Sequence, residues 1–353
     1  MRRLFATTSL ALTIAALPAC DKGDDKKDAA DKAAANKGAD AKAEDGAADG
    51  GKDGGAAEAT ATDLVALVPE GAKIMATVDL AGLMGSALYK QQGAMLESSP
   101  FGQNIAAAKA CNVGPDTWKQ MVLGVDPDGD DAVMIGMSAT GIGVKANIEC
   151  LAAKYKEQDA KADWKIEEAD GRTMVTIDGG DAIAYAVDDD TMVIAGKAWN
   201  DAVKERVGGG GKSAAAGSLE PAMGLAKSGQ HIVFAGLATP EMATGPLTGA
   251  KHFGGSFDLT AGIAMEATVA FADAAGSKAA SDEITKQFEG VKAMASGVGI
   301  PKGVVDSVKI ESADANMTVA FKATPTELEE VGKAAMGMMM MGGGAAPPPA
   351  PPQ

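Results

Sequence analysis

The chain has few of the residues on which most catalytic and metal sites depend. Its 353 residues include two histidines and three cysteines, and only 4% are aromatic. A zinc site or a Ser-His-Asp triad would have to use His231 or His252, and no supporting motif lies near either. A non-catalytic role is therefore favoured, with no cofactor and no metal. A hydrolase without a recognisable motif is the alternative.

Positive charge is also scarce. The chain has 32 Lys and Arg against 48 Asp and Glu, a formal net charge of −16. This balance argues against a nucleic-acid partner and against electrostatic adhesion to anionic lipid. The acidic net charge favours solubility and by itself indicates no particular partner.

Long apolar runs are missing except at the N-terminus. Arg2 and Arg3 precede an apolar segment from Leu4 to Leu17, which is shorter than the roughly 20 residues of a membrane-spanning helix. It ends in the small-residue site Pro18-Ala19-Cys20. The pattern predicts an export signal.

Leu17-Pro18-Ala19-Cys20 resembles the lipobox of bacterial lipoproteins, whose pattern is Leu, Ala or Ser, Gly or Ala, and Cys. Pro18 departs from that pattern. The resemblance, which covers about the first twenty residues, implies that residues 1–19 are a signal peptide. It also implies that Cys20 becomes a lipidated N-terminus on the exported side of the inner or outer membrane. The alternative is an ordinary secretory peptide cut near Ala19.

Two segments of low complexity flank the predicted folded part. Residues 20–62 begin with the lipidated Cys and continue with Ala, Gly, Asp and Lys, which predicts a disordered acidic tether. Such a coil would span on the order of 35 to 40 Å. Residues 336–353 are rich in Met, Gly and Pro and are predicted to be a disordered tail.

Cys111 and Cys150 remain as an even pair if Cys20 is lipidated. In an oxidising compartment such a pair favours a disulfide, with two buried free thiols as the alternative. Closing this loop would stabilise the fold by about 3 to 4 kcal/mol in the chain-entropy model.

The hydrophobic periodicity predicts an α+β fold, an antiparallel sheet with packed helices. Strands are expected at 73–80, 132–137, 231–237 and 264–271, and a meander of strands at 164–195. Helices are expected at 101–110, from Pro115 through Met121, around Ile148 to Tyr155, at 199–207, along Ile284 to Ala295, and after the Thr324 cap. Residues 208–217 are expected to be flexible.

Two internal similarities suggest diverged halves at 63–218 and 219–335. Residues 165–170 match residues 309–314, and 71–75 resemble 229–233. The alternative is chance similarity between β-hairpins.

Three further segments carry residue types typical of ligand binding. Gly211-Lys212-Ser213 is similar to a phosphate-binding loop but lacks its first glycine. Asp126 to Asp131 could gather calcium ligands, although an acidic turn is the simpler interpretation. Met338 to Met341 could hold a soft ion such as Cu(I), but a methionine run in a low-complexity tail is weak support.

The sequence therefore predicts a membrane-anchored exported lipoprotein with a non-catalytic binding or structural domain in the cell envelope. The lipid anchor joins it to the membrane, and the further partner is an unidentified protein or an apolar ligand. A carrier of apolar ligands is an alternative, because helices over a sheet rich in Ala, Met, Leu and Val can enclose an apolar cavity. The oligomeric state is left open.

Overall fold

The computed structural model describes residues 63–342, apart from residues 99, 170, 241, 296 and 298. The predictions for Cys20, the signal peptide, the tether and the last residues of the tail lie outside this range. Within it, no helix combines the length and the apolar character of a membrane span.

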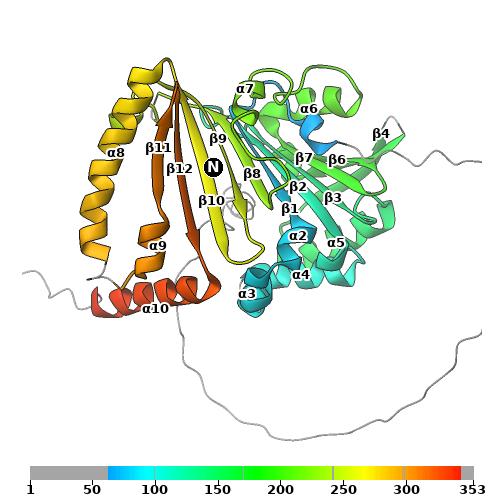
Figure 1. Cartoon of the computed structure of the whole chain (residues 1–353). Coiled ribbons are helices and arrows are strands. Elements are labelled where there is room, and N and C mark those ends of the chain that lie inside the picture. Colours follow the sequence, from blue (N-terminus) through cyan, green and yellow to red (C-terminus); the bar gives the residue numbers. More distant parts are fainter. Residues whose placement is uncertain are drawn as a thin grey trace, which may run out of the picture. The chain divides into compact units, whose positions relative to one another are not determined.

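One antiparallel sheet of twelve strands organises this part of the chain (Figure 1). The predicted α+β class, with helices packed on an antiparallel sheet, is confirmed. In spatial order the strands are β11 (Lys309–Ala313), β12 (Asn316–Ala323), β10 (Ile263–Phe271), β9 (Ala250–Asp258), β8 (Ile232–Leu237), β1 (Ile74–Asp79), β2 (Trp118–Val125), β3 (Val133–Ala139), β7 (Thr191–Gly196), β6 (Ala182–Asp188), β5 (Arg172–Ile177) and β4 (Trp164–Ala169).

The helices lie on both faces of this sheet. They are α2 (Leu80–Gly85), α3 (Ala87–Ser98), α4 (Pro100–Ala110), α5 (Lys145–Gln158), α6 (Asn200–Val207), α7 (Glu220–Met223), α8 (Ala274–Ala295), α9 (Lys302–Ser307) and α10 (Pro325–Gly342). Single 3₁₀ turns are η1 (Leu64–Leu67), η2 (Pro115–Thr117), η3 (Asp178–Gly180), η4 (Lys197–Trp199) and η5 (Gly245–Leu247).

The largest buried cluster defines what we call the first face. There Met75, Val122 and Val193 of the sheet pack against η1, η4 and α6. On the opposite, second face, α4 and α5 cover the neighbouring strands β3, β7 and β6, and α8 covers β10 and β12. The chain therefore builds a core on each face of one sheet.

The β1–β8 pair lies on a two-fold axis of the topology. Ile74 pairs with Gly236 and Val78 pairs with Ile232, so exchanging the equivalent positions of the two strands leaves the register unchanged. Beyond β1 the next two strands follow in chain order, β2 and β3, and a later hairpin adds β7. Beyond β8 the same order is seen, with β9 and β10 followed by β12 from a later hairpin. This register equates residues 71–75 with residues 229–233, the alignment seen in the sequence.

The second similarity falls on strands that are not equivalent in the sheet. Residues 165–169 belong to β4 and 309–313 to β11, which form the two edges. Only β12 separates β11 from β10, whereas three strands separate β4 from β3. The two halves share one sheet, and their origin by duplication stays a hypothesis.

The predicted helix from Pro115 through Met121 is wrong. It is limited to η2, and Trp118–Val125 forms strand β2, which pairs with β1 on one side and with β3 on the other. Val122 is fully buried in that position. Pairing along two edges and burial outweigh the local helical pattern, because propensity is a weak prior against tertiary context.

The predicted disorder of residues 336–353 is also wrong for its first part. Helix α10 continues to Gly342 and includes Met338 to Met341. Methionine is a good helix former, so this run continues a helix that Thr324 caps. The rest of the tail lies outside the described residues.

Strand β9 escaped prediction because of its glycines. A Cβ on Gly255 would lie 2.4 Å from Phe234 Cζ and 2.6 Å from the Glu266 carbonyl oxygen. A Cβ on Gly236 in β8 would lie 2.3 Å from Phe253 Cζ. Phenyl rings thus lie over the glycines of the neighbouring strand, so these glycines allow close packing.

Replacing Gly255 with Ala should therefore destabilise the domain. The new methyl group would collide with a ring and with backbone, an overpacking that costs about 1 to 3 kcal/mol. Urea unfolding followed by circular dichroism measures this change. Gly290→Ala, in α8 with open space around the position, is the matched control and should stabilise by about 0.5 to 1 kcal/mol. Equal effects of the two substitutions would contradict the interpretation.

Candidate functional site

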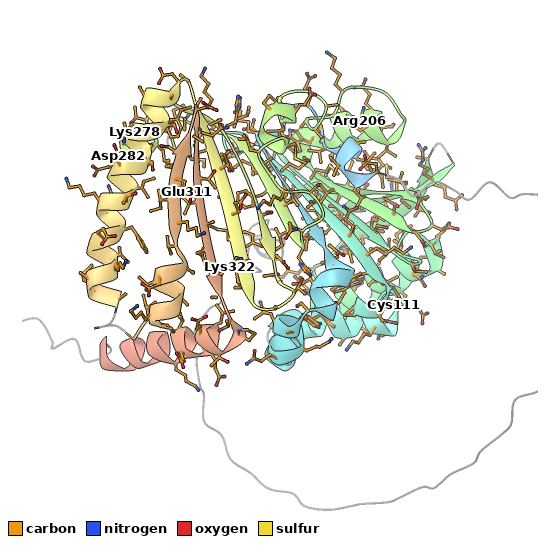
Figure 2. All side chains as sticks on the ribbon, viewed as in Figure 1. Cys111, Arg206, Lys278, Asp282, Glu311 and Lys322 are labelled. Carbon is orange, nitrogen blue, oxygen red and sulfur yellow. A yellow bond between two sulfur atoms is a disulfide. The ribbon has the colours of Figure 1, made fainter. Side chains whose placement is uncertain are left out.

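Cys111 and Cys150 form a disulfide, with their Cα atoms 5.6 Å apart. Cys111 directly follows α4 and Cys150 lies in α5, so the bond joins the two helices that cover β3 and β7 on the second face. Figure 2 shows Cys111 at this place. The disulfide is structural, because Cys111 is buried and surrounded by apolar side chains.

Two carboxylates of the acidic turn between β2 and β3 pair with one lysine. Lys73 Nζ lies 2.9 Å from Asp126 Oδ1 and 2.7 Å from Asp128 Oδ2. Burial acts to raise the pKa of Asp126, but hydrogen bonds from Lys73 and from the Asp128 amide outweigh it, and the pKa is lowered. Two of the carboxylates offered as calcium ligands, Asp126 and Asp128, are thus engaged by Lys73. Residues 63–342, as described, contain no group of three His, Cys, Asp or Glu side chains suited to a metal.

The Gly211-Lys212-Ser213 segment closes the first-face core. The Arg206 guanidinium donates hydrogen bonds to the carbonyls of Ala66, Gly210 and Gly211. Ser213 bridges to Pro69, and the Glu70 amide donates to the Lys212 carbonyl. A phosphate loop needs amide groups directed at the ligand, whereas here carbonyl groups face a side-chain cation. The predicted flexibility of residues 208–217 is likewise wrong, since these bonds fix the segment.

The two histidines lie at opposite ends of β8. His231 precedes the strand, and His252 of β9 pairs with Leu237 at its far end. His231 Nδ1 accepts a hydrogen bond from the Leu259 amide at 3.1 Å and lies 3.5 Å from Asp258 Oδ1. Its Nδ1 is thus an acceptor, the opposite of the role in a Ser-His-Asp triad. The structure brings the histidines into no common site.

The middle of the second face is apolar across six strands. Its side chains on β1, β2, β3, β8, β9 and β10 that lie outside the buried clusters are, by register, Ile74, Ala76, Val78, Met121, Leu123, Val125, Val133, Ile135, Ile232, Phe234, Phe253, Phe257, Ile263, Met265 and Ala267. Phe234 lies 6.4 Å from Phe253 and 5.9 Å from Phe257 between ring centroids. These three rings are partly exposed and belong to none of the four buried clusters. We call this surface the phenylalanine face.

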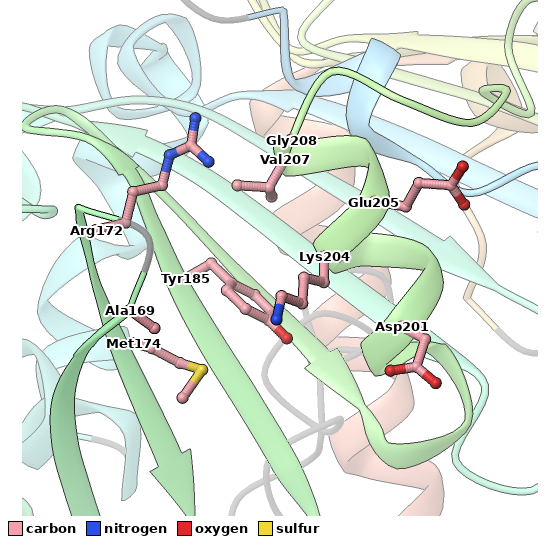
Figure 3. Close-up of a pocket in the computed structure, with 9 residues that line it drawn as sticks. All are labelled: Ala169, Arg172, Met174, Tyr185, Asp201, Lys204, Glu205, Val207 and Gly208. Atoms are coloured by element: carbon pink, nitrogen blue, oxygen red, sulfur yellow. The ribbon is translucent and has the colours of Figure 1, made fainter.

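A second feature is a hollow of about 490 Å³ on the first face (Figure 3). Strands β5 and β6 form one wall with Met174 and Tyr185, and α6 forms the other with Val207. Arg172 lies on the strand side and Asp201 on the helix side. Burial, followed by the charge of Asp201, raises the pKa of Tyr185. The hollow combines an apolar floor with charges of both signs at its rim.

Comparison with known proteins gives only distant similarity. No protein-family model matches the chain, and no curated protein matches it. Two solved structures of TP0453 are similar in fold. Its crystal form I has a TM-score of 0.48 and 10% identity, over 78% of this chain and 98% of that chain. Crystal form IV has a TM-score of 0.44 and 8% identity, over 76% and 96%.

Sequence reasoning identified neither the phenylalanine face nor the hollow. A signal for the first existed, because five of the eight phenylalanines, Phe234, Phe253, Phe257, Phe271 and Phe321, lie on one face. The two within β9 were hidden in its glycine-rich stretch. The hollow depends on how α6 sits over β5 and β6, and no local pattern encodes that distance.

The ion pairs of Lys73 should make stability depend on pH. Because the pKa of Asp126 is lowered in the fold, its carboxylate contributes stability above its ordinary pKa, and this contribution is lost as the pH falls through the lowered value. Lys73→Met should therefore reduce stability at pH 7 and make its decline below about pH 4 less steep. Urea unfolding at several pH values measures both effects.

Lys161→Met is the control, since Lys161 is exposed and its side chain forms no ion pair with another described residue. It should leave the pH profile unchanged. A Lys73→Met profile that runs parallel to the wild-type profile would refute the role of the pair.

Proposed function

We propose that the chain is an exported lipoprotein, anchored by Cys20, that holds a non-catalytic binding domain at the surface of an envelope membrane. The observation that carries the proposal is the order of its segments. A lipobox-like site is followed by about forty residues of acidic low-complexity sequence and then by the folded part. Such a tether would let the domain bind partners away from the lipid head groups.

The disulfide supports export. Bonds of this kind form and persist in oxidising compartments and are rare in the cytosol. Cys111 and Cys150 are bonded, which leaves Cys20 as the one cysteine outside the pair. A thiol at this place can carry a thioether-linked lipid. With two or more acyl chains, each buried CH₂ contributing about 0.8 kcal/mol, the anchor would be stable.

Cys20→Ser should abolish lipidation and release the protein from membranes. Intact-mass analysis of the natively expressed mature product should show a diacylglycerol-type mass addition in the wild type and none in the variant. The Cys111→Ser/Cys150→Ser double variant is the control, since it removes the other two cysteines and should keep the lipid. A wild-type mature product without added mass would refute the anchor.

A second function, carriage of apolar ligands, is favoured by the phenylalanine face. Contiguous apolar surfaces of this kind mark binding sites, because exposing them to water is costly. The backbone groups beneath it are paired within the sheet, so the surface offers a ligand no hydrogen bonds. A lipid acyl chain requires none, whereas an extended peptide would leave its own amides unsatisfied.

Met265→Glu should remove bound lipid if the domain is such a carrier. A carboxylate at this position would have to be buried beneath the ligand, and the penalty should lower the retained lipid by about tenfold. Mass spectrometry of lipid extracted from the purified protein measures the loss. Ala264→Glu, on the same strand but on the first face beside Asp258 and Lys322, is the control. Equal lipid in both variants, or none in the wild type, would exclude the carrier function.

A further inference from the structure

We propose that the hollow between α6 and strands β5 and β6 is a binding site for short peptides with free termini. The hollow lies on the first face of the sheet, opposite the phenylalanine face and independent of the membrane anchor. All of its lining residues belong to the folded domain. Figure 3 shows the side chains involved.

The size and floor of the hollow fit a small ligand. Its volume of about 490 Å³ lies within the roughly 300 to 1,000 Å³ of ligand pockets. Tyr185 and Val207 are 6% and 7% exposed and are held in the first-face core, and Met174 packs against them. The floor is therefore rigid and apolar and suits an apolar side chain of the ligand.

The strand wall is basic and the helix wall carries a net negative charge. Arg172 projects from β5 on one side, and Asp201, Lys204 and Glu205 lie on α6 on the other (Figure 3). Among the ion pairs between described residues, none involves Arg172 or Asp201. A guanidinium binds a carboxylate in a planar, two-pronged geometry, and a carboxylate is the natural partner of an ammonium group. The two walls can thus bind the carboxylate and the ammonium group of a single ligand.

These charges select the ligand class. A ligand of one sign would match the net charge of only one wall, so a zwitterion is favoured. A free amino acid carries its ammonium and carboxylate on one carbon, whereas a peptide separates them by about 3.3 to 3.6 Å per residue. A short peptide can therefore direct its carboxyl terminus to Arg172 and its amino terminus to Asp201.

A polar group in the floor can recognise the peptide backbone. The hydroxyl of Tyr185 makes one long hydrogen bond of 3.5 Å to the Asn200 carbonyl, longer than the usual 2.5 to 3.0 Å for such groups. Asn200 also has a buried Oδ1 with no hydrogen-bond partner among the described residues. The Tyr185 hydroxyl is thus available to an amide or a carbonyl of a ligand. An apolar ligand would leave this hydroxyl unsatisfied.

Isothermal titration calorimetry of the full-length protein with the tripeptide Ala-Leu-Ala tests the site. Saturable binding is expected, and N-acetylation or C-amidation of the peptide should each weaken it by about tenfold, the loss of one charge-assisted contact.

Two variants assign the contacts. Arg172→Gln should bind the free and the amidated peptide equally, and Asp201→Asn should bind the free and the acetylated peptide equally. Lys197→Gln and Glu220→Gln are exposed controls outside the hollow, and they should retain the wild-type preferences. Thermal unfolding of all four variants should match the wild type, which separates loss of the site from loss of the fold.

The proposal is overturned if the tripeptide shows no saturable binding at millimolar concentration. It is also overturned if blocking the termini has no effect, or if the preference for free termini survives in both rim variants. None of these results would bear on lipidation of Cys20, whose mass analysis is independent.

Discussion

The antiparallel pairing of β1 with β8 is the contact on which the rest of the domain depends. It joins strands that are far apart in the sequence, and its symmetric register places Ala76 opposite Phe234 on the axis. Every other strand adds outward from this pair. Such pairing of distant segments has a high entropic cost of loop closure, which the buried clusters on the two faces offset.

The two faces of the sheet have separate chemistry. Beyond α7, the first face is polar over β10 to β12, where Thr268 bonds Thr318 at 3.0 Å and Lys227 pairs with Glu266. Glu311 and Lys322 lie on the same strands (Figure 2). The second face of the same central strands carries phenylalanine and aliphatic side chains. Period-two alternation thus directs polar and apolar partners to opposite sides of one layer.

The sequence was sufficient where local patterns and burial agreed. The alternating strands from Trp164 to Ala195, helix α6 and the Thr324 cap could be predicted because each has a clear period or cap. The sequence was insufficient where contacts between residues far apart in the chain determine the local structure. Strand β2 follows a helical start signal, and β9 contains glycines that only make sense beneath Phe234 and beside α7. The hollow beside Arg172 needs three elements in place and has no motif of its own.

The two edges of the sheet have a consequence for how copies of the domain meet. An open edge strand invites pairing with another molecule, and charged side chains or a covering helix prevent this. Helix α8 packs along β11, while β4 has Lys165 paired with Glu167, and Glu168 paired with Lys145. These guarded edges therefore disfavour the growth of the sheet from one copy of the domain into the next.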